Sequence, residues 1–497
     1  MKRFFFAIGT SLLLASFCAP ISAQESLPSR LTALLNKDKL TRANLSVLVL
    51  PIEETTPVLS VNAERPMNPA STMKIITSLV ALEELGPNYR WNTALLSEQK
   101  INKAKLDGNL YLRGGGDPNF TVEKLGNMLR RLRYLGVQRI KGDIVLDRRF
   151  FQPTRPDLVA PVFDEAPTAY YNVVPDALLV HSNLVALSLN ATNDNIDVQL
   201  QSALSDVTIV NHLVLSDAPC AEWEKHWSAP QFNIKPRAAI EIGLFGAFPR
   251  KCHITSYFSH LDRNTFIENT IRTLWKEMGG TWQGRVQDGE TPNTATVLVD
   301  YLSDTLVENI RNINKFSDNS MARSIYLTLG AEANARGLAE PSKNRNNLNE
   351  TVATTAQTSE LQVRRWLNRH NINDQGIVIE NGAGLSRIER LNAMQLARVL
   401  QEAYRSKWYP EFASSLPIVA LDGTMRKRLK ASVAEQRARI KTGTLRDALA
   451  IAGYVRDVEN KDWIVVAFIN TDGPVKGRQV LDDLILWVTQ GRPSDPQ

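Results

Sequence analysis

The order of strand-rich and helix-rich segments along the chain is the feature that most limits its possible folds. Residues 45–62 (LSVLVLPIEETTPVLSVN) alternate around a Pro/Glu/Thr turn and predict a β-hairpin. Short alternating runs predict a β-rich region from about residue 95 to 259, and apolar residues at helical spacing predict helices from 260 to 412. Three strands and a helix are predicted at the C-terminal end. Strands at both ends with helices between them indicate one α+β domain whose two halves flank an inserted β-rich region.

The length of the chain also predicts several domains. A chain of 497 residues exceeds what one hydrophobic core usually organises, and 43% hydrophobic residues is typical of globular proteins. We predict a main domain, an antiparallel sheet covered by helices, from residues 24–95 and 260–497. Residues 96–165 and 235–259 are predicted to form one inserted β-rich domain (domain II), and residues 166–234 a second one (domain III).

The N-terminal segment 1–23 has the pattern of a cleaved export signal. Lys2 and Arg3 supply positive charge, residues 4–17 form an apolar run, and Ile-Ser-Ala precedes a predicted mature N-terminus near Gln24. A membrane anchor is the alternative, but the run is shorter than the roughly 20 apolar residues of a membrane-spanning helix, and no later segment qualifies. We therefore expect a periplasmic protein with at most peripheral membrane contact.

The cysteines bear on the same question. Cys18 would suggest lipidation, but Phe17 occupies the position where a lipoprotein signal has a small residue. Removal of the signal leaves Cys220 and Cys252, and an exported protein favours the pairing of two thiols that are otherwise free. We predict a Cys220–Cys252 disulfide, with two separate buried cysteines as the alternative.

Charge and histidine content argue against other classes of function. The formal net charge is +6 and falls to +4 when Lys2 and Arg3 are removed, which suits an anionic polymer without indicating nucleic-acid binding. The six histidines show no His-x-x-Glu-His spacing, and no G-x-S-x-G segment occurs. We therefore expect no nucleic-acid partner, no metal and no cofactor.

A first candidate motif begins a predicted helix. Ser71 and Lys74 are three residues apart at the start of the run STMKIITSLVALEEL, so a hydroxyl and an amine share one helix face. Lys74 could then deprotonate Ser71. The motif alone is weak, because Ser97 and Lys100 repeat the same spacing by chance.

A second candidate motif, Ser317-Asp318-Asn319, lies between two predicted helices. A hydroxyl and a carboxamide could converge from this loop onto a cleft. The alternative is that the triplet caps a helix N-terminus, since Ser, Asp and Asn all accept from free backbone N–H groups. Both interpretations are compatible with the sequence.

A third candidate motif, Lys441-Thr442-Gly443-Thr444, lies on a predicted late strand. Gly443 would let a substrate backbone approach, while Lys441 and the threonines could hold a carboxylate. A solvated lysine on an edge strand is the alternative. The order of the three motifs, and the element on which each lies, make a joint coincidence improbable.

Together the three motifs resemble those of the penicillin-recognising serine hydrolases, the superfamily of penicillin-binding proteins and serine β-lactamases. Further segments are similar to the class C low-molecular-mass penicillin-binding proteins, which are D-alanyl-D-alanine carboxypeptidase/endopeptidases. These segments are YLRGGGDPNF at 111–120, YYNVVPDAL at 170–178, ENGAGLSR at 380–387 and LDGTMRKRL at 421–429. The resemblance implies a transpeptidase-like α+β domain with a large β-rich insertion.

The resemblance also implies roles for the motif residues. Ser71, activated by Lys74, would attack the carbonyl between two D-amino acids and form an acyl-enzyme, with the backbone amides of Ser71 and Thr444 stabilising the oxyanion. Ser317 would relay a proton to the departing amine and Asn319 would hold the acyl-side amide. Because an ordinary lysine pKa is about 10.4, burial and the nearby Lys441 charge are expected to lower the pKa of Lys74.

Three further groups are candidates for substrate contact. Arg387 and the basic run 426–428 could contact acidic carboxylates of the peptidoglycan stem peptide, with a solvated surface as the alternative. Asp164 could receive the free amine of a diamino acid in that peptide. The expected partners are therefore peptidoglycan peptides, with β-lactam antibiotics as covalent inhibitors.

Two other functions compete with a D,D-peptidase. A β-lactamase or esterase on the same scaffold would need a dedicated base for fast deacylation. A binding module would be acylated by penicillin without turnover. The sequence leaves open the balance between carboxypeptidase and endopeptidase action, and it leaves open a homodimer.

Overall fold

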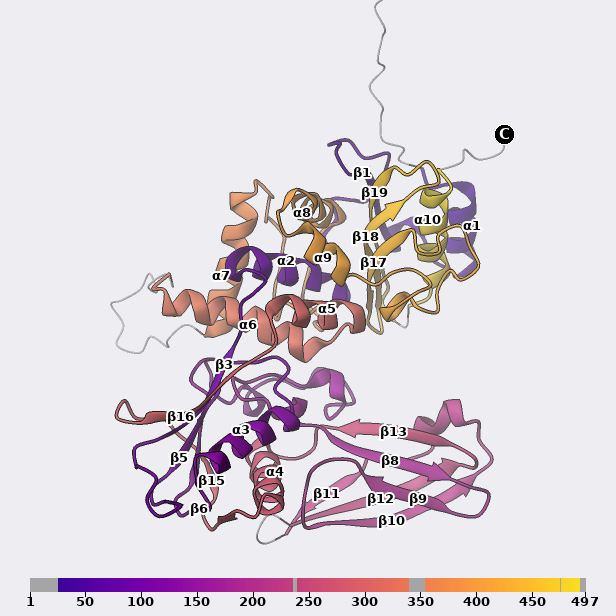
Figure 1. Ribbon diagram of the computed structural model, residues 1–497. Coiled ribbons are helices and arrows are strands. Elements are labelled where there is room, and N and C mark those ends of the chain that lie inside the picture. The colour runs from indigo at the N-terminus through magenta and orange to yellow at the C-terminus, as the bar shows by residue number, and fades with distance from the viewer. Residues whose placement is uncertain (1–25, 236–238, 339–353, 474, 492–497) are drawn as a thin grey trace, which may run out of the picture.

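The computed structural model of the protein describes residues 26–235, 239–338, 354–473 and 475–491. The predicted export signal, including Cys18, lies outside these residues. Figure 1 shows a main domain of sheet and helices stacked on an inserted, strand-rich region. The main domain contains both ends of the described chain.

A five-stranded antiparallel sheet forms the centre of the main domain. Its order is β17-β18-β19-β1-β2, so the last three strands of the chain pair with the first two. The predicted N-terminal hairpin and the three predicted C-terminal strands are confirmed. The strand bounds are β1 (Leu45–Pro51), β2 (Leu59–Val61), β17 (Ala438–Thr444), β18 (Ala448–Arg456) and β19 (Asp462–Asn470).

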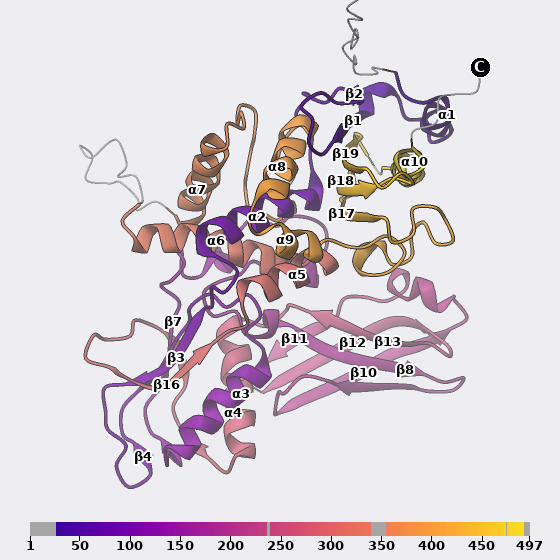
Figure 2. The same ribbon diagram turned by 45° about the horizontal axis from the view of Figure 1, so that its top comes forward.

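Helices cover both faces of this sheet, as the two views in Figures 1 and 2 show. Along β1, Val47 and Val49 enter the core beneath α1 and α10, whereas Leu48 and Leu50 enter the core beneath the other helices. Successive side chains of a strand point to opposite faces, so a strand buried on both sides reads as a continuous apolar run. The helices are α1 (Ser29–Lys37), α2 (Lys74–Leu85), α5 (Leu306–Phe316), α6 (Asn319–Ala335), α7 (Thr355–Arg369), α8 (Ala393–Arg405), α9 (Tyr409–Ser415) and α10 (Arg478–Thr489).

The inserted region enters and leaves the main domain on two paired strands. Entering strand β3 pairs antiparallel with leaving strand β16, with Asn92 opposite Leu302, so the insertion leaves the two halves of the main domain side by side. These strands belong to a mixed sheet of order β15-β7-β5-β3-β16, next to a small sheet of order β14-β6-β4. The bounds are β3 (Asn92–Ser97), β4 (Lys105–Leu106), β5 (Leu110–Arg113), β6 (Arg139–Ile140), β7 (Ile144–Asp147), β14 (Thr281–Trp282), β15 (Val286–Asp288) and β16 (Thr296–Leu302), with helices α3 (Val122–Tyr134) and α4 (Arg263–Glu277).

The remaining strands of the insertion form two three-stranded sheets. Their orders are β10-β12-β11 and β13-β8-β9. They share one apolar core with the mixed sheet and its helices. The bounds are β8 (Val185–Ala191), β9 (Ile196–Leu200), β10 (Val207–Ser216), β11 (Gln231–Ile234), β12 (Ile240–Pro249) and β13 (His253–Phe258).

The strand pairing differs from the predicted domain boundaries in two places. Residues 235–259, which we assigned together with 96–165, contain β12 and β13, and these strands pair with β10, β11 and β8 of the other unit. Residues 263–302, which we assigned to the main domain, form α4 and β14–β16 and pack within the insertion. Helical periodicity identified α4 but carries no information on which core its apolar face enters.

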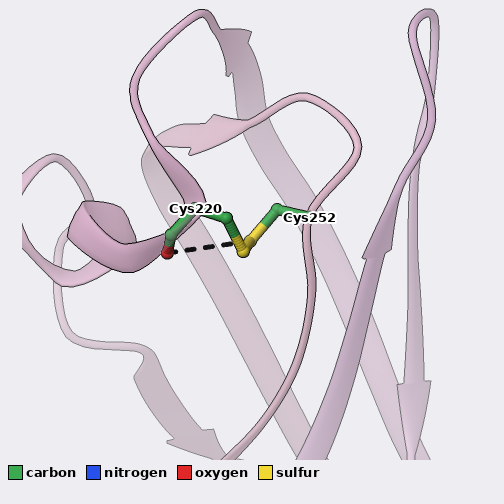
Figure 3. The surroundings of a disulfide bond; sticks show 2 residues. All are labelled: Cys220 and Cys252. Carbon is green, nitrogen blue, oxygen red and sulfur yellow. Dashed lines mark hydrogen bonds between the residues drawn. A yellow bond between two sulfur atoms is a disulfide. The ribbon is translucent and has the colours of Figure 1, made fainter.

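The predicted disulfide is confirmed. It joins Cys220, at the start of a short 3-10 helix (Cys220–Lys225), to Cys252 in the turn between β12 and β13. Figure 3 shows the two side chains meeting, one from the short helix and one from a loop. The bond therefore ties the connection between β10 and β11 to the C-terminal end of β12. Among the described residues, no helix is long and apolar enough to cross a membrane.

We expect removal of this disulfide to destabilise the insertion. The bond closes a segment with a sequence separation of 32, and restriction of a loop of this size in the unfolded chain stabilises the folded state by roughly 3 kcal/mol. The double substitution Cys220→Ser/Cys252→Ser should lower the free energy of unfolding, measured by urea denaturation, by about that amount. Peptide mapping without reduction should recover one fragment joining the two cysteines, and two freely alkylated thiols would contradict the assignment.

Candidate active site

Ser71 and Lys74 lie at the junction of a short 3-10 turn (Ala70–Met73) and helix α2. Lys74 is the first residue of α2, and its Nζ is hydrogen-bonded to Ser71 Oγ at 2.9 Å. The three-residue spacing places both side chains on one face, as the sequence predicted. The arrangement puts an amine within proton-transfer distance of the serine hydroxyl.

The Lys74 side chain is fully buried, and its amine has two further partners. Nζ donates to Asn319 Oδ1 at 2.7 Å and to the carbonyl of Ala383 at 2.5 Å. Burial disfavours the charged form and lowers the pKa of Lys74 to about 7, while the negative charges of Asp318 and Glu389 oppose that shift. The side chain can therefore be a neutral base near neutral pH.

The Ser317-Asp318-Asn319 triplet is both a helix cap and part of this cluster. Ser317 ends α5 in the left-handed conformation (φ 62°), and Asp318 caps α6 by accepting from the backbone N–H of Met321 at 2.8 Å. Asn319 begins α6 and points its carboxamide at Lys74. The left-handed turn at Ser317 lets α6 begin directly after α5, with Ser317 in contact with Lys441 and Asn319 in contact with Lys74.

The third motif lies on β17 and reaches the second one. Lys441 is fully buried, and its Nζ donates to Ser317 Oγ and to the carbonyl of Thr442, both at 2.8 Å. Burial lowers the pKa of Lys441 well below its usual value, and the nearby Lys74 charge lowers it further. Burial is thus the main cause of the expected shift at Lys74, whereas the coupling between the lysines acts on the pKa of Lys441.

Two glycines allow the chain to pass close to the nucleophile. A Cβ on Gly443 would lie 2.9 Å from the backbone nitrogen of Ser71, so β17 runs directly against the serine turn. Gly384 has a positive φ of 80°, and a Cβ there would lie 1.9 Å from the carbonyl oxygen of Ala70. These close approaches bring β17 and the loop containing Ala383 to the same turn.

Arg387 and Asp164 lie beside this cluster on opposing segments. The Arg387 guanidinium stacks over the ring of Phe163 at 4.6 Å and pairs with Asp447 at 3.0 Å. Asp164 accepts from the hydroxyl of Tyr171 at 3.0 Å and from an adjacent asparagine amide. In this state both predicted substrate-contacting groups have partners within the protein.

The basic run 426–428 differs between its members. Arg428 is tied to Asp482 of α10 by an ion pair of 2.6 Å, and Arg426 donates to the carbonyl of Gly423 at 3.2 Å. These two side chains therefore have structural contacts outside the Ser71 cluster.

Sequence reasoning missed several groups that contact the cluster. The carbonyl of Tyr171, from the insertion, accepts from Asn319 Nδ2 at 3.1 Å, and Thr424 Oγ1 shares a hydrogen bond of 2.8 Å with Thr442 Oγ1. The carbonyl of Ala383 accepts from Lys74. All three groups lie in segments that carried the family resemblance. The sequence therefore marked these segments but gave no role for the individual residues.

A cavity of about 650 Å³ lies between the main domain and the insertion, next to this cluster. Its walls include Asn172, which follows Tyr171, and Asn381, Leu385 and Arg387, which surround Ala383 in the chain. Many of the other lining residues are apolar, Phe163 among them. A cavity of this size is in the range of small-molecule and peptide sites.

The central antiparallel sheet, the helices on both faces and the inserted strands define a penicillin-binding-protein and β-lactamase-like α+β fold, as predicted. The chain belongs to the D-Ala-D-Ala carboxypeptidase 3 (S13) family, whose model matches residues 27–490. The resemblance found in the sequence is thereby confirmed, and the protein is a serine peptidase of the D-Ala-D-Ala carboxypeptidase type.

Comparisons with individual proteins agree with this family. The chain is 24% identical over 473 residues to the D-alanyl-D-alanine carboxypeptidase DacB of Haemophilus influenzae, covering 93% of this chain and 92% of that one. The crystal structure of penicillin binding protein 4 (dacB) from H. influenzae matches with a TM-score of 0.73, 22% identity, and coverage of 92% and 99%. The same protein complexed with a β-lactam matches with a TM-score of 0.70, 21% identity, and coverage of 94% and 99%.

The close packing of β17 predicts the effect of a methyl group at Gly443. The substitution Gly443→Ala should force β17 away from the Ser71 turn, since the added Cβ has 2.9 Å to the Ser71 nitrogen. We expect D-alanine release from a D-Ala-D-Ala-terminated peptide to fall roughly 10- to 100-fold. The matched control is Gly473→Ala, where a Cβ meets no atom within 4 Å and activity should be retained. Wild-type activity in Gly443→Ala would contradict this geometry.

Proposed function

We propose that the protein is an exported, periplasmic D-Ala-D-Ala carboxypeptidase and D,D-endopeptidase that acts through an acyl-enzyme on Ser71. The observation that carries this proposal is the buried Lys74 amine, hydrogen-bonded to Ser71 Oγ at 2.9 Å, with a pKa lowered to about 7. A lysine in that state can accept the hydroxyl proton at neutral pH.

The first half-reaction forms the acyl-enzyme. Neutral Lys74 takes the proton of Ser71, and Oγ attacks the carbonyl between two D-residues. The backbone amides of Ser71 and Thr444 stabilise the oxyanion. The peptide C–N bond then breaks, and Ser317, hydrogen-bonded to Lys441 at 2.8 Å, relays the proton taken up by Lys74 to the departing amine, which leaves Lys74 neutral again. Water hydrolyses the ester, which restores Ser71.

The substrate is held on both sides of the bond that breaks. Lys441, Thr442 and Thr444 bind the terminal carboxylate, which charge-assisted hydrogen bonds favour. Asn319 holds the acyl-side amide. The stem peptide continues into the cavity of about 650 Å³, where Arg387 meets a carboxylate.

Asp164, which follows Phe163 of the cavity wall in the chain, meets the amine of a diamino acid. To do so, its carboxylate exchanges the hydrogen bond from Tyr171, now 3.0 Å, for one from the substrate. Carboxypeptidase and endopeptidase action share this acyl side and differ only in the amine that leaves. The open cavity beside the cluster supports acceptance of a cross-linked peptide as well as a single strand.

β-Lactams acylate the same serine in this proposal. Support comes from the likeness in fold to penicillin binding protein 4 of H. influenzae, which has been solved in complex with a β-lactam. The modest positive charge of the chain also suits an anionic cell-wall polymer.

Exposure to benzylpenicillin should produce a covalent adduct on Ser71. Mass spectrometry of the intact protein is expected to show full conversion for the wild type and none for Ser71→Ala. Ser97→Ala is the matched control, because Ser97 has the same spacing to a lysine but lies on β3 of the insertion. Digestion of purified muropeptides should release D-alanine and cleaved cross-links. Rapid release of opened drug would instead support a β-lactamase, and no adduct in the wild type would contradict the proposal.

The pH dependence of acylation should report the Lys74 amine. Protonated Lys74 cannot accept the Ser71 proton, so the rate should fall as pH drops through about 7, the pKa of Lys74, and level off above it. Lys74→Arg keeps a permanent positive charge and should lower the acylation rate by about 100-fold or more. Stopped-flow acylation by a chromogenic β-lactam between pH 5 and 9 measures both effects. A pH-independent wild-type rate would contradict the assigned base.

A further inference from the structure

The Glu389 carboxylate is fully buried and organises the loop that precedes it. Its Oε1 accepts from the backbone N–H groups of Glu380, Asn381 and Gly382 at 3.1, 3.0 and 3.1 Å. Three donors on one oxygen fix the turn, because each bond constrains a different residue of it. No residue of the three sequence motifs takes part in these bonds.

The same loop supplies backbone contacts to the helix that carries the proposed base. The carbonyl of Ala383 accepts from Lys74 Nζ at 2.5 Å, and the carbonyl of Gly382 accepts from Thr77 Oγ1 at 2.6 Å. Thr77 lies three residues after Lys74 in the same helix. The loop held by Glu389 therefore contacts two positions about one turn apart on α2.

We propose that Glu389 is a positioning residue for the reaction, which holds the Ala383 carbonyl against the Lys74 amine and places a buried negative charge beside it. This inference rests on the proposed function, because it assigns a task at the same site. It adds a residue to the machinery that touches neither Ser71 nor, in the proposed mechanism, the substrate.

Four charged groups face Lys74 from the elements packed around it. Asp318 at the start of α6 and Glu389 favour its charged form, whereas Arg323 on α6 disfavours it. Lys441 faces it from β17. Without the Glu389 charge, burial would lower the pKa of Lys74 further, so the carboxylate helps to keep the base near its working pH.

Arg323 is a buried positive group that interacts with the Glu389 charge. Burial lowers the pKa of Arg323, and the Glu389 charge opposes that shift. Within the described residues, Arg323 Nε and Glu389 Oε2 are buried without a hydrogen-bond partner. Burial raises the pKa of Glu389, whereas the three backbone N–H groups that it accepts from oppose this shift and stabilise its charged form.

Two substitutions separate the contribution of the carboxylate charge from that of the hydrogen bonds. Glu389→Gln keeps an oxygen that can accept the three backbone bonds but removes the charge. We expect the acid limb of its β-lactam acylation profile to move to lower pH by at least about 0.3 pH units. Loss of the Glu389 charge lowers the pKa of Lys74, and a twofold change in the proton affinity of Lys74 corresponds to log10(2), about 0.3 pH units. Glu389→Ala removes both, and its plateau rate above pH 8 should fall roughly 10- to 100-fold.

The matched control is Glu459→Gln, which removes an exposed carboxylate in the turn between β18 and β19 and should leave the pH profile unchanged. Circular dichroism checks that each variant folds, and if Glu389→Ala does not fold, the Glu389→Gln profile decides alone. An unmoved acid limb in Glu389→Gln, or a wild-type plateau in folded Glu389→Ala, overturns the proposal. Both results leave the proposed function intact, which fails instead if wild-type Ser71 is not acylated.

Discussion

The burial of one amine organises this molecule. Lys74 has no exposed surface, yet its Nζ makes hydrogen bonds to Ser71, Asn319 and Ala383. A buried amine that is not fully partnered is strongly destabilising, so the fold must bring polar groups from two distant segments to the turn that carries Ser71 and Lys74. The helix that carries Lys74 runs through the largest apolar core of the main domain, which fixes the amine while its partners are brought to it.

The insertion is arranged so that it leaves this centre undisturbed. The chain leaves the main domain on β3 and returns on β16. Because these strands pair with each other, the insertion is joined to the main domain by a two-stranded stalk. The stalk is tied at its base, where the backbone N–H groups of Trp91 and Ser303 each bond to the other residue. The insertion then returns to the site through the Tyr171 carbonyl, which accepts from Asn319.

The sequence allowed prediction of the parts whose signals are local. The motif spacings placed Ser71 and Lys74 on one face, Asn319 at a helix start and Lys441 on a strand, and the structure brings these side chains together. The division of the insertion into domains could not be predicted, because it depends on contacts between segments that are far apart in the sequence. An amphipathic pattern at 263–277 identifies a helix without naming the sheet it covers, and the role of Glu389 depends on amides that only the folded loop presents to it.

Electrostatic repulsion couples the protonation of the two buried lysines. Lys74 and Lys441 both lie in surroundings that disfavour charge, and the charge of the first lowers the pKa of the second. Two ammonium groups in one desolvated cluster repel each other, so protonation of one favours loss of the proton from the other. In the proposed mechanism Lys74 is the neutral partner and serves as the base for Ser71, while Lys441 hydrogen-bonds to Ser317.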